Sequence, residues 1–116
     1  MSEKTVLIVE DDEMTAALLE VIVKEAGFEP LIAIDGVSAI EQYQTHQPAI
    51  ILLDIHLPLV NGYSIATLIR DFSNHQPRIF VVTSSPEDYE EHLKNLTNGC
   101  VTKPINRQKL LELLQG

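Results

Sequence analysis

Residues 6–12 read Val-Leu-Ile-Val-Glu-Asp-Asp, four apolar side chains followed at once by three acidic ones. A strand that is apolar at every position is typical of a parallel sheet, because helices cover both of its faces. The acidic side chains then follow the carboxyl end of the strand, where open α/β sheets bind their ligands. This stretch therefore predicts a buried parallel strand with a carboxylate site beside it.

Four further short runs rich in Val, Ile and Leu resemble the first, and segments of helical period separate them. The five predicted strands are 6–9, 31–34, 50–53, 79–82 and 100–102. Five strand–helix pairs predict an α/β fold, a flavodoxin-like doubly wound five-stranded parallel sheet in the order 2-1-3-4-5 with five helices. No linker or repeat interrupts the chain, so residues 1–116 are predicted to form one domain.

Apolar residues at helical spacing predict the buried face of each helix. They are Met14, Leu18, Ile22 and Ala26 in the first helix, Val37, Ile40 and Tyr43 in the second, Ile65, Leu68, Ile69 and Phe72 in the third, and Ile105, Leu110, Leu111, Leu113 and Leu114 in the last. Gly27 and Pro48 mark the ends of the first two helices. The stretch Ser85-Pro86-Glu87-Asp88 predicts the start of the fourth helix, with Ser85 as its cap.

Composition excludes several classes of function. The formal charge is −9, whereas binding to nucleic acid needs clustered Lys and Arg, so direct nucleic-acid binding is not expected. No apolar run approaches the ~20 residues of a membrane span, and the N-terminus lacks the pattern of a signal peptide. We therefore expect no membrane association and a cytoplasmic location. Cys100 is the single cysteine, so no internal disulfide is possible.

Two of the predicted strands end on carboxylates. Glu10 and Asp11 follow the first strand, and Asp54 closes the third. If these strands are neighbours, the carboxylates converge, and like charges so close raise each other's pKa values unless a cation neutralises them. Mg²⁺ prefers oxygen ligands of this kind. An acidic cluster after a strand is also a common helix cap and solvated turn, so these residues alone leave both interpretations open.

Two more polar residues close predicted strands, Thr83 the fourth and Lys103 the fifth. Each has an ordinary structural explanation, because Thr83 can cap the following turn and Lys103 can be an exposed lysine before a proline. Together with a metal, however, these groups are what phosphoryl transfer to a carboxylate requires. They supply a nucleophile, cations that neutralise developing charge, and a hydrogen-bond donor for a phosphoryl oxygen.

With these residues in place, the sequence resembles the receiver domain of bacterial response regulators over essentially the whole chain. The matching features are Val6 to Asp12, Asp35-Gly36, Asp54-Ile-His-Leu-Pro-Leu-Val-Asn-Gly62, Thr83, and Thr102-Lys103-Pro104. The family pattern of an Asp followed four residues later by Pro, and then by Asn or Asp before Gly, is matched in full. The resemblance implies a phosphorylation switch of a two-component or phosphorelay system, and not an enzyme that acts on a separate substrate.

The resemblance also implies a metal site and a modified residue. Asp54 would accept the phosphoryl group and become 4-aspartylphosphate. Asp11, Asp54 and the backbone carbonyl of His56 would bind Mg²⁺ directly, and Glu10 matches the other acidic position, which often acts through a metal-bound water. For the His56 side chain, an influence on hydrolysis of the phosphoryl group and direct catalysis both stay open.

Further roles follow from the same resemblance. Thr83 would donate to a phosphoryl oxygen, and Lys103 would pair with the phosphoryl group or with the free carboxylate. The Lys103–Pro104 peptide bond is expected to be cis. Asp12 lies just beyond the acidic pair, and we assign it to capping the first helix.

The implied partners are proteins. A sensor histidine kinase or a phosphotransfer protein would supply the phosphoryl group, and a downstream target would bind the face formed by the fourth helix, fifth strand and fifth helix. A weak homodimer is compatible with the family. Cys100 stands where an aromatic residue is typical, so we expect output to proceed through Ser84, Ser85 and the start of the fourth helix, with Cys100 as buried packing.

Three alternatives remain from the sequence. A phosphohydrolase with an aspartyl-phosphate intermediate shares this constellation but usually has a second Asp two residues after the nucleophile, where this chain has His56. A flavodoxin-like cofactor binder is disfavoured because Glu10, Asp11 and Asp12 would repel an anionic cofactor. A structural pseudo-receiver is disfavoured because all five active-site positions are filled. Whether the chain acts alone or within a larger regulator stays open.

Overall fold

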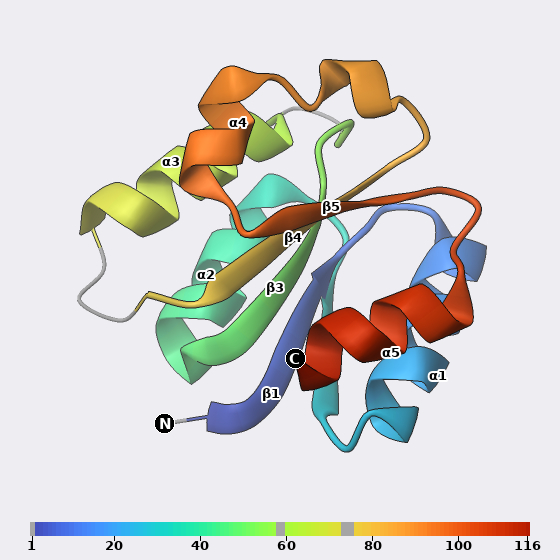
Figure 1. The fold of residues 1–116 in the computed structure, drawn as a ribbon. Coiled ribbons are helices and arrows are strands. Elements are labelled where there is room, and N and C mark those ends of the chain that lie inside the picture. The colour runs from blue at the N-terminus through green and yellow to red at the C-terminus, as the bar shows by residue number, and fades with distance from the viewer. Residues whose placement is uncertain (1, 58–59, 73–75) are drawn as a thin grey trace.

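A computed structural model describes residues 2–57, 60–72 and 76–116 of the chain. The elements follow one another as β1 (Ser2–Val9), α1 (Glu13–Glu25), β2 (Glu29–Ala33), α2 (Gly36–His46), β3 (Pro48–Asp54), α3 (Gly62–Phe72), β4 (Arg78–Thr83), the 3-10 helix η1 (Pro86–Asp88), α4 (Glu91–Leu96), β5 (Gly99–Thr102) and α5 (Arg107–Gln115). The five strands form one parallel sheet in the order β2-β1-β3-β4-β5 (Figure 1). The predicted α/β doubly wound fold is confirmed.

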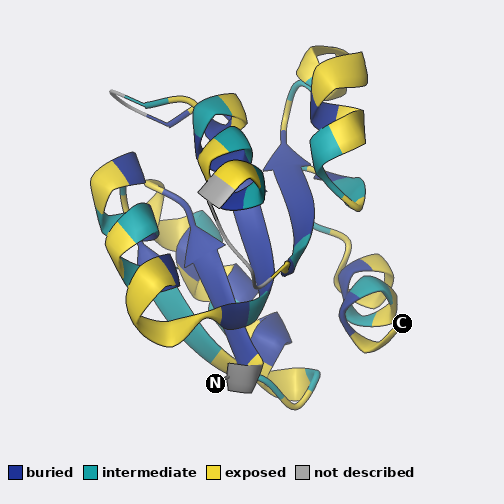
Figure 2. Ribbon diagram, turned by 90° about the vertical axis from the view of Figure 1, so that its left-hand side faces the viewer, coloured by how far each residue is buried: buried dark blue, intermediate teal, exposed yellow. Residues whose placement is uncertain are grey.

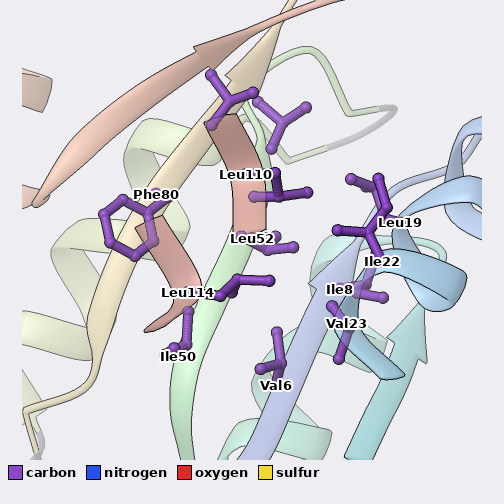
Figure 3. Packing of buried hydrophobic residues seen from close by; sticks show 12 residues of the cluster. Val6, Ile8, Leu19, Ile22, Val23, Ile50, Leu52, Phe80, Leu110 and Leu114 are labelled. Carbon is purple, nitrogen blue, oxygen red and sulfur yellow. The ribbon is translucent and has the colours of Figure 1, made fainter. Parts of the chain in front are cut away.

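The sheet is apolar on both faces because successive strand residues point to opposite sides. On one face, side chains of β1 and β3 pack against α1 and α5, and Figure 3 shows this cluster around Ile8, Leu52, Leu19 and Leu110. On the other face, the alternate strand residues pack against α2 and α3. The buried strands between two exposed helix layers are visible in Figure 2. This arrangement leaves the strand ends as the place where polar side chains gather.

The predicted helix faces are only partly correct. In α1 the buried residues include Leu19 and Ile22, whereas Met14 is 83% exposed and Leu18 is also exposed. A spacing of four overshoots a helical turn of about 3.6 residues, so the predicted stripe drifts away from the core. Val37 in α2 and Leu68 in α3 were likewise predicted to be buried and are exposed.

The other predicted core positions fall as follows. Tyr43 of α2, Ile65 and Ile69 of α3, and Leu110 and Leu114 of α5 are buried. Partly buried side chains that pack against these clusters include Ala26, Ile40, Ile105, Leu111 and Leu113. Ile105 precedes α5, and the side chain of Phe72 lies outside the described part of the structure.

The predicted start of the fourth helix is wrong. Pro86–Asp88 forms the separate 3-10 helix η1, and α4 begins at Glu91. The side chain of Ser85 makes no capping hydrogen bond; instead its backbone N–H donates to the hydroxyl of Thr83 at 3.0 Å. The sequence Ser-Pro-Glu-Asp thus forms one tight turn and not the first turn of the longer helix. The chain still has to run from the end of β4 to α4, which begins at Glu91.

Other local predictions are confirmed. The carboxylate of Asp12 caps α1 by accepting from the backbone N–H of Thr15 at 2.9 Å. Gly27 follows the end of α1 with φ of +92°, a conformation that glycine adopts without steric cost. The Lys103–Pro104 bond is cis. Within the described ranges, no helix combines the length and apolar character needed to cross a membrane.

A half-buried arginine joins α3 to the far end of α4. The guanidinium of Arg70 donates to the carbonyl oxygen of Leu96 at 2.8 Å and to that of Pro77 at 2.8 Å. It also donates to the side chain of Asn98 at 3.2 Å, and Asn98 in turn accepts from the N–H of Ile79 at the start of β4. Burial lowers the pKa of Arg70 from its usual value. The carboxyl end of α4 is therefore fixed to the scaffold by hydrogen bonds.

Candidate functional site

Three carboxylates meet at the carboxyl edge of the sheet. In Figure 1 the strands end toward the upper right. Val9 of β1 lies opposite Leu53 of β3, so the next residues, Glu10 and Asp54, are neighbours. One oxygen each of Glu10, Asp11 and Asp54 lies within 4.8 Å of the others. Glu10 is 1% exposed and Asp54 is 5% exposed, while Asp11 faces solvent. The fold thus buries two like charges side by side and leaves the third at the opening.

Lys103, which follows β5, brings an ammonium group to these carboxylates. Its Nζ lies 3.0 Å from Oε1 of Glu10 and 3.4 Å from Oδ2 of Asp54. Burial would lower the pKa of Lys103, but the contacts with Glu10 and Asp54 outweigh it, and the pKa is raised. Lys103 therefore stays charged. Its ammonium group contacts both buried carboxylates, so Lys103 is not simply an exposed lysine before a proline.

Burial disfavours the charged form of Glu10. Burial raises the pKa of its carboxyl group, and the contact with Lys103 compensates only in part. Its Oε2 accepts from the N–H of Asp12 at 3.1 Å, and its Oε1 lies 3.0 Å from the ammonium nitrogen of Lys103. One ammonium group therefore faces the two buried carboxylates of Glu10 and Asp54, with Asp11 close by. An additional cation would balance the remaining negative charge.

This donor set fits Mg²⁺. The cation prefers carboxylate and carbonyl oxygens, keeps part of its hydration, and usually takes only one or two carboxylates. Glu10, Asp11 and Asp54 offer such oxygens within 4.8 Å of one another, and Asp11 is exposed to solvent. Three carboxylates beside the single ammonium group of Lys103 are the observation of this structure that favours a cation there.

Backbone contacts fix the orientation of Asp54. Its Oδ1 accepts from the N–H of His56 at 2.9 Å, and its Oδ2 faces Lys103. Gly62 closes the same loop by donating its N–H to the carbonyl oxygen of Ile55 at 3.2 Å. A Cβ atom on Gly62 would lie 2.7 Å from Cα of Ile55 and 3.0 Å from the carbonyl oxygen of Asp54. Only glycine allows this close approach, which explains its place in the motif.

Thr83 is fully buried at the end of β4, next to β3 in the sheet. Val82 lies opposite Asp54, so Thr83 is one residue further toward the crevice. Its hydroxyl accepts from the N–H of Ser85 and therefore stabilises the turn, as the structural interpretation expected. A hydroxyl that accepts one hydrogen bond can still donate its own proton, so this turn is compatible with a contact to a ligand.

Two contacts near the site were not predicted from the sequence. The exposed imidazole of His56 turns to the carboxylate of Asp88 in η1, with 2.9 Å between Nε2 and Oδ2. Tyr89 packs with Cys100 against the cluster of Ile55, Val81 and Leu93. Both contacts join segments that are distant in sequence, so no spacing of residues predicts them.

A shallow apolar hollow of about 330 Å³ lies beside Lys103 on the α1 side of the site. It is lined by Met14, Thr15, Leu18, Lys103, Pro104 and Ile105. The two α1 residues that the sequence placed in the core, Met14 and Leu18, thus border this hollow.

Comparisons with known proteins agree with this geometry. Residues 6–115 match the family model of the response regulator receiver domain. The polar-differentiation response regulator DivK of Brucella anthropi is 30% identical over 97% of this chain and 94% of its own length. The crystal structure of the chemotaxis protein CheY4 of Vibrio cholerae is similar with a TM-score of 0.87 at 27% identity, covering 98% of both chains.

A further solved structure carries a metal at the corresponding kind of site. The receiver domain of a sensor histidine kinase of Pseudomonas aeruginosa has a magnesium ion coordinated in its active-site cleft. It covers 98% of this chain and 96% of its own, with a TM-score of 0.87 and 26% identity. The family match over nearly the whole chain, the relative at 30% identity and the sheet order lead to one conclusion. This chain belongs to the response regulator receiver domain family of two-component signalling proteins.

Proposed function

We propose that the chain is a Mg²⁺-dependent phosphorylation switch in which Asp54 accepts a phosphoryl group from a histidine kinase or a phosphotransfer protein. The observation that carries this proposal is the position of Asp54. Its carboxylate is buried between the acidic pair, Glu10 and Asp11, and the ammonium group of Lys103. A buried nucleophile beside fixed charges of both signs is suited to receive an anionic group together with its cation.

In the proposed reaction, a carboxylate oxygen of Asp54 attacks the phosphorus atom of the donor. A new O–P bond forms, the P–N bond to the donor histidine breaks, and its electron pair stays on the histidine nitrogen. Lys103 is 3.4 Å from Oδ2 of Asp54 and would neutralise charge on the phosphoryl oxygens. Thr83 would donate a hydrogen bond from its hydroxyl group to one of these oxygens. Asp11, Asp54 and the backbone carbonyl of His56 would hold Mg²⁺, with Glu10 beside it, and the ion would supply further positive charge.

The same proposal covers the setting of the domain. We infer that residues 1–116 act as one cytoplasmic signalling domain that catalyses only its own phosphorylation and slow dephosphorylation. A protein donor would lie over the apolar hollow beside Lys103, because Met14 and Leu18 are the exposed apolar side chains that border it. Against a phosphohydrolase, position 56 carries a histidine whose side chain is engaged by Asp88. A turnover assay on small phosphate esters separates the two.

Incubation with a small acyl phosphate and Mg²⁺ is expected to add one phosphoryl group to the protein. The reason is that the domain itself carries the groups that stabilise the transfer, so a simple donor can replace the kinase. Intact-mass analysis measures the product, and peptide mapping locates it. Chelation of the metal should remove nearly all of the product. An unmodified protein after saturating donor and Mg²⁺ would refute the proposed function.

Output would involve the loop from β4 to α4. Cys100 is half-buried, so its predicted burial is only partly correct, and Tyr89 packs against the same cluster of Ile55, Val81 and Leu93. Tyr89 also bonds through its hydroxyl to the side chain of Thr97 at 2.8 Å, across the length of α4. An aromatic side chain therefore does fill this region, although it comes from the segment that follows η1. A partner that recognises α4, β5 and α5 would sense its movement.

A Tyr89→Ala variant is expected to lose at least half of the response of α4 to phosphorylation. Removing the ring deletes its packing against Leu93 and its bond to Thr97, so movement of the loop is no longer passed to the helix. The measurement is the NMR shift change of α4 amides on adding beryllofluoride as a phosphoryl mimic. Val37→Ala, at an exposed side chain of α2, is the control. A full response in Tyr89→Ala, or its loss in Cys100→Ala, would show that Cys100 or another residue carries the signal.

A further inference from the structure

Two loops border the acceptor, and one contact between side chains joins them. The first loop follows β3 and contains His56; the second follows β4 and contains η1 with Asp88. Nε2 of His56 lies 2.9 Å from Oδ2 of Asp88, and both side chains are about half exposed. We call this pair the strap. It connects the segments that follow the strand ends of Asp54 and Thr83.

The strap completes a ring of contacts around the acceptor. The N–H of His56 donates to Asp54, and the N–H of Asp88 donates to the carbonyl oxygen of Ser85 at 2.9 Å. The N–H of Ser85 donates to the hydroxyl of Thr83. Asp54 and Thr83 end neighbouring strands, and each of these hydrogen bonds has a backbone N–H as its donor. The strap is the contact of the ring that is formed by two side chains.

We infer that Asp88 is a positioning residue that holds His56 across the mouth of the crevice and limits access to Asp54. This inference rests on the proposed function, because it concerns how fast Asp54 gains and loses its phosphoryl group. Donor and water must both reach the in-line position on phosphorus from outside the crevice. An opened strap therefore admits both, and the two rates should rise together. A residue that only stabilised the phosphorylated form would leave the rate of phosphorylation unchanged.

The expected size of the effect is modest. A half-exposed polar contact of this kind shifts an equilibrium by about fivefold at most, since water competes for both side chains. Opening the strap should accordingly raise each rate about three- to fivefold. The steady-state level of phosphorylation should change little, because it depends on the ratio of the two rates. This pattern distinguishes a barrier to access from a change in affinity for the metal or the donor.

The experiment compares wild type, Asp88→Ala, His56→Ala and the double variant at saturating Mg²⁺. Intact-mass analysis follows phosphorylation by a small acyl phosphate and then hydrolysis after the donor is removed. Glu87→Ala is the matched control, because it removes an exposed carboxylate from the same turn of η1. Both rates should rise in Asp88→Ala and stay at wild-type values in Glu87→Ala. In the His56→Ala background, the additional change at position 88 should have no effect.

Opposite outcomes overturn the inference. It fails if Asp88→Ala leaves both rates unchanged, moves them in opposite directions, or retains its full effect in the absence of the His56 side chain. If wild type takes up no phosphoryl group, the proposed function has failed, and amide hydrogen exchange then decides about the strap. His56→Ala should speed exchange of the Asp88 and Tyr89 amides, which bond to Ser85 and Pro86. Unchanged exchange in η1 would show that the two loops are not joined by this pair.

Discussion

An Asp54→Asn variant is expected to acquire no phosphoryl group from a small acyl phosphate, whereas wild type acquires one. The amide keeps the size and shape of the carboxylate but lacks a nucleophilic oxygen able to form the acyl phosphate. Asp54 is buried and its Oδ2 faces Lys103, so its carboxylate lies beside the cation that would neutralise the incoming phosphoryl group. The readout is intact mass after treatment with donor and Mg²⁺.

The same variant should fold at least as well as wild type. Asp54 and Glu10 are buried like charges, and removal of one of them relieves their repulsion. Urea unfolding should therefore give a midpoint equal to or above that of wild type, which excludes unfolding as the cause of lost modification. Asp12→Asn, which changes a nearby exposed carboxylate with a capping role, should still be phosphorylated. A base-labile phosphate of equal yield on Asp54→Asn would show that the acceptor lies elsewhere.

An Asp11→Asn variant is expected to bind Mg²⁺ at least about 10- to 100-fold more weakly than wild type. Even residues that only orient metal ligands typically cost this much when they are replaced, and Asp11 is expected to be a direct ligand. Its exposed carboxylate supplies charge at the solvent side of the cluster, which Lys103 does not contact in the described structure. Phosphorylation at limiting Mg²⁺ should fall in parallel.

Titration calorimetry or NMR shifts measure this affinity, because the chain has no tryptophan to report binding. Glu13→Gln is the matched control, since it removes one exposed negative charge two residues away in the first turn of α1. Its affinity should stay close to that of wild type. Equal affinities of wild type and Asp11→Asn would remove Asp11 from the metal site.

The sequence predicted the sheet well because its signals are local. An apolar run such as Val6 to Val9 cannot be satisfied at a solvated surface, and its sheet position follows from the alternation with helices. The site residues could be predicted in the same way, because each is the last residue of a strand or follows directly after one. The meeting of Glu10, Asp54 and Lys103 needed only the order of the strands.

Features that depend on contacts between distant segments were not predictable in this way. The inward face of α1 is set by how the helix lies on the sheet, so Leu19 is buried and Leu18 is not. The turn at Ser85 includes a hydrogen bond from its backbone N–H to the hydroxyl of Thr83. The residue types alone had suggested a helix cap at Ser85, and this cap is not formed. The partners of His56 and Tyr89 come from neighbouring loops, and their sequence separation carries no period.

The hydrogen bonds of Arg70 bear on how α4 is able to move. Because the guanidinium holds the carbonyl oxygen of Leu96 and the side chain of Asn98, the carboxyl end of this short helix serves as a fulcrum. A pull that starts at Ser85 would then swing the amino end, at Glu91, through the largest arc. The helix would act as a lever rather than a sliding rod, and the acidic side chain of Glu91 in its first turn would lie on the part of the surface that moves most.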